Sequence, residues 1–238
     1  MRHPLRRTLA ILLAVLVALV VAACTGDDGD KAAADAPTPA EVLDQAKGTL
    51  DETPGLRLSL TTDDLPDGVT GITSAVGVAT KAPAFDGTIK VVLSGTEFEV
   101  PVVAVDDKVY AQIPLTPGYS DVDPAEYGAP DPAGLITSDH GFSSLLPVTT
   151  AIEKGESVRG GADNSEVLTS YTGAIPGDAM KKVIPSASGE TFDATYLITD
   201  DGELREAELT GVFYPDSDEM TYTVTFDDYG TEQSITAP

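Results

Sequence analysis

Alternating apolar side chains recur along two long stretches of the chain. Leu56, Leu58 and Leu60 stand between polar residues, which is the pattern of an antiparallel strand with one buried face. The same period of two returns in 72–78, 89–93, 98–104, 109–113, 167–173, 192–198, 204–213 and 220–226, with turn residues between the runs, and more weakly in 233–236. These runs predict a meander of roughly ten strands, wide enough to curl into a U-shaped sheet.

Helical patterns are few and short. Thr38, Pro39 and Glu41 predict a capping box at the start of a helix with one apolar face, and 176–184 predicts a second helix. Five prolines between 114 and 132 exclude a central strand or a long helix there. Short helices at 132–136 and 141–146 are expected to cover the sheet or to flank the mouth of a cavity. The fold class is therefore α+β.

The first 24 residues have the pattern of a lipoprotein leader. Arg2, Arg6 and Arg7 precede 15 residues without a charged or polar side chain, Leu9 to Ala23, a run shorter than the roughly 20 residues of a spanning helix. Two alanines then precede Cys24, as in a lipobox. We expect a signal peptide at 1–23, an acylated Cys24 with a flexible tether at 24–37, and a single domain at 38–238. An uncleaved anchor helix is the alternative.

Charge and rare residues narrow the range of functions. The chain carries 14 basic and 39 acidic residues and a formal net charge of -25, which argues against nucleic acid as a partner. One Cys and two His exclude an internal disulfide and a Cys/His zinc cluster. The acidic runs at 27–30 and 216–219 are interpreted as solvated, so no metal or cofactor is expected. His140, near Ser143 and Ser144, lacks the strand-turn-helix of a hydrolase, and we expect no enzyme.

The order of these features resembles the actinobacterial LppX/LprA/LprF/LprG lipoprotein family, most of all its LprG branch. The resemblance rests on Cys24, the acidic tether, the capped helix and the C-terminal order 195–202, 204–209, 220–226 and Tyr229-Gly230. It implies a half-barrel similar to LolA and LolB, with short α-helices on the concave side of a strongly curved antiparallel sheet and a hydrophobic cavity between them. It also implies binding of phosphatidylinositol mannosides, lipomannan, lipoarabinomannan or triacylglycerol, often beside a major-facilitator efflux transporter.

We therefore expect a monomeric carrier of di- or triacylated lipids, anchored through Cys24 to the extracytoplasmic side of the cell membrane. The alternative is an anchored interaction module that scaffolds a transporter or cell-wall complex without lipid cargo. The residues expected to line the cavity are Leu58, Leu60, Val76, Val78, Ile89, Val91, Leu93, Phe98, Val100, Val102, Tyr171, Tyr196, Val224 and Phe226. For each of them, packing in an ordinary filled core is the alternative.

Overall fold

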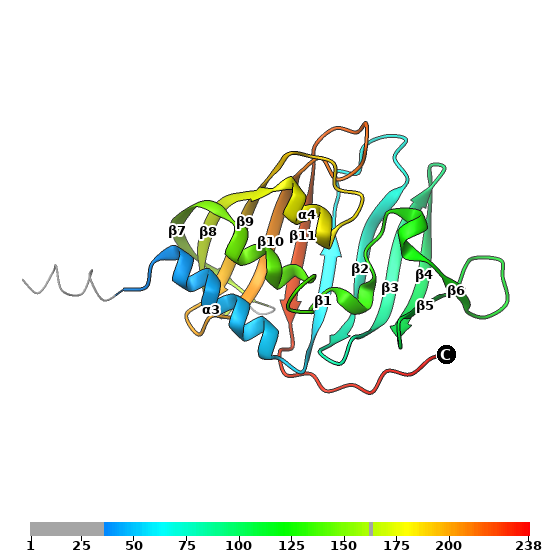
Figure 1. Cartoon of the computed structure of the whole chain (residues 1–238), viewed down its shortest axis with the longest axis horizontal. Helices are drawn as coiled ribbons and strands as arrows, with labels where there is room; N and C mark the ends of the chain where they lie inside the picture. Colours follow the sequence, from blue (N-terminus) through cyan, green and yellow to red (C-terminus); the bar gives the residue numbers. More distant parts are fainter. Residues whose placement is uncertain (1–35, 162–163) are drawn as a thin grey trace, which may run out of the picture. The chain divides into compact units, whose positions relative to one another are not determined.

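The computed structural model describes residues 36–161 and 164–238, so the predicted signal peptide, Cys24 and most of the predicted tether lie outside the described residues. Within these described ranges, eleven antiparallel strands form one open sheet (Figure 1). The first meander is β1 (Gly55–Thr61), β2 (Gly71–Thr80), β3 (Ala84–Leu93), β4 (Thr96–Val105), β5 (Lys108–Ala111) and β6 (Ser120–Val122). The second is β7 (Thr150–Gly160), β8 (Glu166–Pro176), β9 (Thr191–Thr199), β10 (Leu204–Gly211) and β11 (Met220–Asp227).

The sheet consists of two meanders rather than the single one expected. Strand β1 pairs with β11, so the first and last strands of the domain meet in the middle of the sheet. Strands β6 and β7 form its two outer edges. The chain between these edges, residues 123–149, contains no strand and crosses from one half of the sheet to the other.

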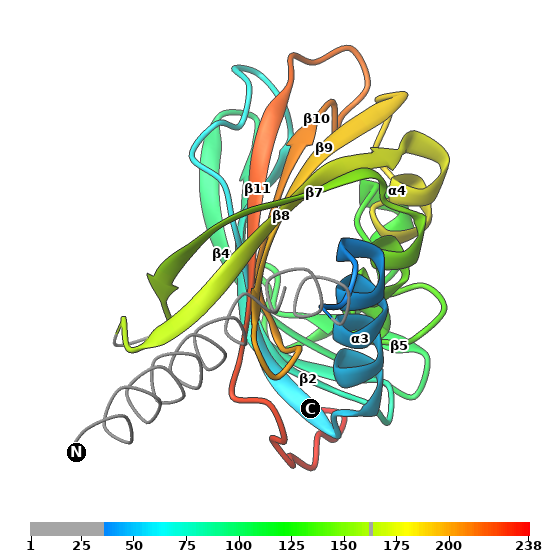
Figure 2. The same ribbon diagram turned by 90° about the vertical axis from the view of Figure 1, so that its left-hand side faces the viewer.

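Short helices lie on the concave side of the curved sheet (Figure 2). They are α3 (Pro39–Glu52), the 3-10 helices η1 (Pro124–Tyr127), η2 (Pro132–Gly134) and η3 (Phe142–Val148), and α4 (Gly177–Val183). The predicted helices at 132–136 and 141–146 are present as 3-10 turns. Within η3, Pro147 lacks the backbone N–H that an α-helical bond would need. The α+β half-barrel is confirmed.

Helix α3 starts where the sequence predicts. The Thr38 hydroxyl accepts the backbone N–H of Glu41 at 3.3 Å, and the Glu41 carboxylate accepts the N–H of Thr38 at 2.8 Å. These contacts satisfy donors that would otherwise have no partner in the first turn. The helix buries Leu43, Ala46 and Leu50. Together with η3 and α4 it covers the concave face of the second meander.

A β-bulge in β2 changes which side chains face inward. Ile72 pairs with Val91 and Ser74 pairs with Lys90, so Thr73 is an extra residue in the ladder. Because one extra residue reverses the alternation, the inner side chains after the bulge are those of Ala75, Gly77 and Ala79. The sequence-based placement of Val76 and Val78 on the inner face is wrong. Both face the convex side, where Val76 is 38% exposed.

Two glycines shape the concave face beside this bulge. Gly77 of β2 pairs directly with Gly87 of β3. A Cβ atom at either position would lie 2.5 to 2.6 Å from the Phe85 ring, so the ring lies against bare backbone. Glycine in a strand marks such a close approach. Phe85, 1% exposed, is thereby held flat on the inner surface of the sheet.

The sequence analysis misses one strand and predicts another that is absent. The sequence pattern does not predict β7, because nearly all of its residues are exposed, on both faces, and its few apolar residues do not alternate with polar ones. The predicted strand at 233–236 is absent, since this stretch has no ladder pairing. The C-terminal segment is instead held by single contacts, with Thr231 N–H donating to Gly55 O and Gln233 Nε2 to Asp86 Oδ2.

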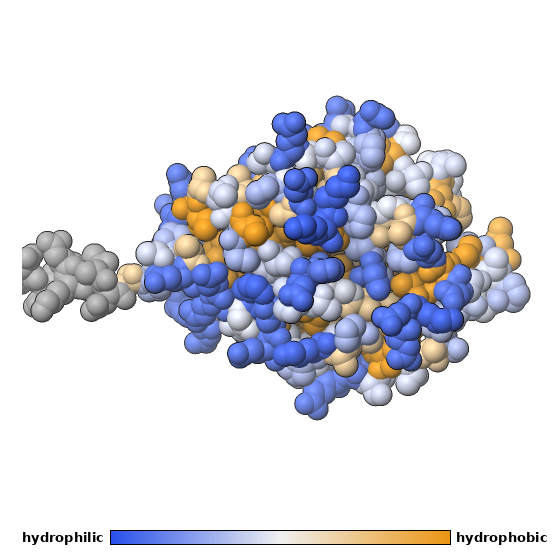
Figure 3. Space-filling model, in the orientation of Figure 1, coloured by the Kyte–Doolittle hydropathy of each residue, from blue (hydrophilic) through white to orange (hydrophobic). Residues whose placement is uncertain are grey.

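Hydrophilic side chains cover much of the face drawn in Figure 3, with apolar ones in scattered groups. This agrees with the strongly acidic composition of the chain. Among the described residues, no helix has both the length and the apolar character to cross a membrane.

Candidate functional site

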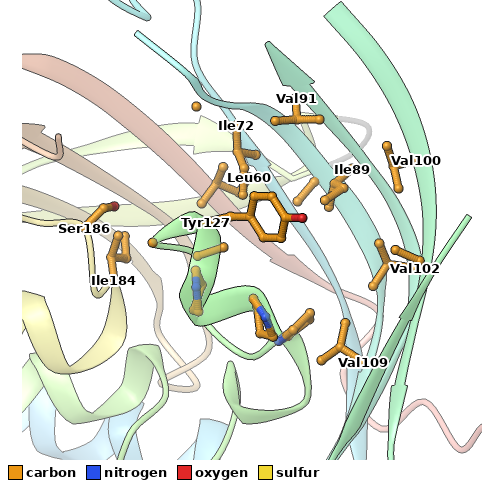
Figure 4. A pocket seen from close by; sticks show the side chains of 18 of the residues that line it. Leu60, Ile72, Ile89, Val91, Val100, Val102, Val109, Tyr127, Ile184 and Ser186 are labelled. Carbon is orange, nitrogen blue, oxygen red and sulfur yellow. The ribbon is translucent and has the colours of Figure 1, made fainter. Parts of the chain in front are cut away.

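An apolar pocket of about 240 Å³ lies on the concave side of the first meander. Most of its wall is formed by β1 to β5, with Tyr214 and Tyr222 at one side, and its lid is residues 113–135, called here the cover segment. No charged side chain is among the residues that line it. Figure 4 shows Leu60, Ile89, Val91, Val100, Val102 and Val109 pointing into this space from successive strands.

Strand register explains why these residues meet. Ile89 pairs with Ala75 on one side and with Val100 on the other, and Val102 pairs with Ala111. Residues directly opposite in an antiparallel pair share a face, so the alternation predicted from the sequence converges on one surface. The predicted residues that line the pocket are Leu58, Leu60, Ile89, Val91, Leu93, Val100 and Val102.

The other predicted residues lie elsewhere. Phe98 is on the same face as Val91 and packs against the core without lining the pocket. Tyr171, Tyr196, Val224 and Phe226 are at most 5% exposed, and they lie on the inner face of the second meander, which the helices fill. Phe226 meets the Phe142 ring of η3 edge to face, with centroids 5.9 Å apart. The Tyr196 hydroxyl bonds to Thr149 at 2.9 Å, and burial raises its pKa to about 12.

The cover segment supplies lining residues that period-two reasoning did not find. They include Pro114, Val122, Pro124, Tyr127, Pro130, Pro132 and Leu135. Apart from the clustered prolines, no periodicity marks them in the sequence. The Tyr127 ring stands inside the pocket near Ile89 (Figure 4) and is 63% exposed. The segment is tied to the chain after α4 where Ser186 N–H donates to Gly128 O at 3.2 Å.

Polar groups in the pocket wall are mostly bonded to each other. The Tyr214 hydroxyl accepts the N–H of Ile72 at 3.1 Å. The Tyr214 and Tyr222 hydroxyls are hydrogen-bonded to each other at 2.8 Å, and the Tyr222 hydroxyl donates to Ile72 O at 2.7 Å. This closed set satisfies both backbone groups of Ile72 beside the bulge. Burial raises the pKa of Tyr222, and the Tyr214 hydroxyl adds to the rise. The wall therefore offers an almost wholly apolar surface.

Polar side chains outside the pocket are engaged in structural contacts. Ser143 donates to Asp51 at 2.6 Å and Ser144 donates to Gly141 O at 2.7 Å, while the nearby His140 is exposed. The turn at 216–219 is closed by Ser217, which donates to Tyr214 O at 2.9 Å. The part of the chain that the structure describes contains no group of three or more His, Cys, Asp or Glu placed to hold a metal ion.

Known proteins are similar to this chain in sequence or in fold. The chain is 27% identical over 240 residues, 98% of each chain, to the lipoarabinomannan carrier protein LprG of Mycolicibacterium hassiacum. It is 27% identical over 217 residues to the protein of that name from Mycobacterium tuberculosis, covering 88% of this chain and 89% of that one.

Two solved structures match the fold. LprF from Mycobacterium bovis superimposes with a TM-score of 0.69 at 16% identity, covering 85% of this chain and 98% of that one. The Mycobacterium tuberculosis lipoprotein LppX gives 0.59 at 18% identity, covering 83% and 98%. The family model of the LppX_LprAFG lipoproteins matches residues 38–236, which is nearly the whole domain. The chain therefore belongs to the LppX_LprAFG lipoprotein family.

Proposed function

We propose that this protein is a lipid carrier, held on the extracytoplasmic side of the cell membrane by acyl chains on Cys24. The observation that carries the proposal is the apolar pocket, whose lining contains no charged residue. The names of its LprG relatives, lipoarabinomannan carrier proteins, support an acylated glycolipid as cargo. Other di- or triacylated lipids, triacylglycerol included, would present the same apolar chains to the wall.

The physical task of such a carrier is to replace the bilayer around an acyl chain. A chain of about 16 carbons loses roughly 13 kcal/mol when it enters water, at about 0.8 kcal/mol per methylene. Contacts with the walls of β1 to β5 would recover much of this free energy without any covalent step. Apolar contacts carry little directional information, so selectivity is expected for chain number and volume more than for the headgroup.

Pocket size implies that the cover segment moves when cargo enters. The volume of about 240 Å³ is below the range of about 300–1,000 Å³ for pockets that hold drug-sized ligands. The segment is anchored at β6, which pairs with β5. Beyond β6, few polar contacts tie it to the rest of the domain: Gly128 O accepts from Ser186 N–H, and Leu135 O accepts from Phe142 N–H. Outward movement of the segment would enlarge the pocket to admit more than one chain.

The direct test is mass spectrometry of organic extracts from the purified full-length protein. Recovery of about one di- or triacylated lipid per protein is expected. A clean extract, obtained from protein isolated without detergent, would instead favour an anchored scaffolding module for a transporter or cell-wall complex.

The Tyr127→Ala variant is expected to bind more or bulkier lipid, because it removes a ring that occupies pocket space. The ring is 63% exposed, so the free energy of unfolding should change by no more than about 0.5 kcal/mol. Extracted lipid and chemical denaturation measure the two effects. Tyr119→Ala is a suitable control, because Tyr119 is exposed on the adjacent loop without lining the pocket. Equal loading of both variants would contradict a pocket role for Tyr127.

A further inference from the structure

Apolar side chains are exposed around one end of the pocket. Three residues that line the pocket are also exposed to solvent: Leu93 (38%), Ile113 (38%) and Tyr127 (63%). They therefore mark its mouth. Leu115 and Tyr119, on the loop between β5 and β6, extend this surface and are 105% and 39% exposed. These five residues are called here the apolar rim. One of the groups of hydrophobic residues in Figure 3 lies toward the end of the molecule where this loop projects in Figure 1.

The backbone holds Leu115 outward in a fixed turn. Its φ of 69° lies in the left-handed region, which is unfavourable for a side chain such as leucine. The turn is closed by Thr116, whose N–H and hydroxyl both donate to Ile113 O, at 3.1 and 2.7 Å. Pro114 and Pro117 stiffen the chain on either side. A fully exposed leucine is therefore held in a strained backbone conformation.

Charge near the rim favours an uncharged partner. Lys108 pairs with Asp121, but the sequence has no Lys or Arg between Lys108 and Lys154, and Asp123 and Glu126 are exposed beside the rim. Anionic headgroups would be repelled within a Debye length of these carboxylates. Tyrosine is also suited to the boundary between headgroups and acyl chains, because its ring is apolar and its hydroxyl polar.

We propose that the apolar rim inserts into the surface of a membrane of uncharged or zwitterionic lipid, with Leu115 as the deepest residue. Insertion would place the pocket mouth against the acyl layer, and a chain would then pass between bilayer and pocket without crossing water. The passage of cargo rests on the carrier function proposed above. The insertion itself does not, since it requires only the exposed residues and their turn.

The chain contains no Trp, so a single introduced Trp reports insertion without background. Full-length Leu115→Trp protein is incubated with phosphatidylcholine vesicles, and emission and quenching by brominated phosphatidylcholine are recorded. We expect emission to shift to shorter wavelength and to be quenched. Val167→Trp is the matched control, because Val167 is 47% exposed on β8, in the other half of the sheet. It should show neither effect.

Charge dependence provides a second readout. Replacing part of the phosphatidylcholine by phosphatidylglycerol should reduce the quenching of the Leu115→Trp variant, and added salt should restore it because salt screens the repulsion. Emission from Leu115→Trp that does not change with vesicles, or matches that of Val167→Trp, overturns the proposal. Stronger quenching in phosphatidylglycerol vesicles would overturn the choice of an uncharged surface.

Transfer kinetics separate failure of insertion from failure of the carrier function. The Leu115→Asp variant should retain the lipid content of the unmodified protein, since Leu115 does not line the pocket. Its rate of lipid transfer between phosphatidylcholine vesicles should fall roughly tenfold, the effect of losing one buried leucine. An unchanged transfer rate overturns the role of the rim. If neither the unmodified protein nor Leu115→Asp contained lipid, while Leu115→Trp still inserted into vesicles, the carrier function would be contradicted and the insertion would not.

Discussion

Lipid recovered from the Val91→Trp variant is expected to fall at least tenfold relative to the unmodified protein. Val91 lines the pocket near the C-terminal end of β3, and an indole there fills space that an acyl chain would occupy. Excluding only two methylenes removes about 1.6 kcal/mol of favourable burial, which corresponds to roughly a tenfold loss of affinity. Because the ring enters a space that is already open, the free energy of unfolding should change by only about 1 kcal/mol.

Val76→Trp is the matched control for this experiment. It makes the same substitution on the neighbouring strand, on the convex face, where Val76 is 38% exposed. Lipid content measured by mass spectrometry should equal that of the unmodified protein. Retained loading in Val91→Trp with unaltered stability, or equal losses in both variants, would contradict the assignment of the pocket as the lipid site.

The Phe226→Ala variant is expected to lose about 3–5 kcal/mol of unfolding free energy, the usual result of removing a buried phenylalanine. Phe226 is fully buried on β11, which pairs with β1 at the junction of the two meanders, and its ring meets Phe142 of η3. Its removal leaves a cavity at the point where both halves of the sheet and the helical layer meet. The surrounding strands are paired on both sides, so collapse of the cavity is restricted.

Denaturant titration monitored by circular dichroism measures this loss. Val158→Ala on the β7 edge is the control, because Val158 is 43% exposed, and it should change stability by less than about 0.5 kcal/mol. If Phe226→Ala lost less than about 1 kcal/mol of unfolding free energy, the junction of the two meanders would have to relax around the missing ring. That result would contradict tight packing at the junction.

The strands with one polar and one apolar face were predictable because their alternation needs only local information. β4, β9 and β11 follow their patterns closely, and the Thr38 capping box fixes the start of α3. β7 was not predictable, because an edge strand exposed on both faces has no alternation to detect. The error at Val76 and Val78 came from the bulge at Thr73, which Tyr214 and Tyr222 stabilise from residues about 150 positions away.

Family membership and the inner faces of β1, β3, β4 and β5 were thus determined by the sequence, through strand period, turn residues and the order of elements. Which part of the inner face is pocket and which is filled core was decided only by the tertiary structure. Leu60 and Val224 are directly paired across β1 and β11 and equally apolar. The helices fill the space above the second meander, whereas the proline-rich cover segment cannot pack closely above the first. That difference depends on the volume of elements distant in sequence, which no local pattern encodes.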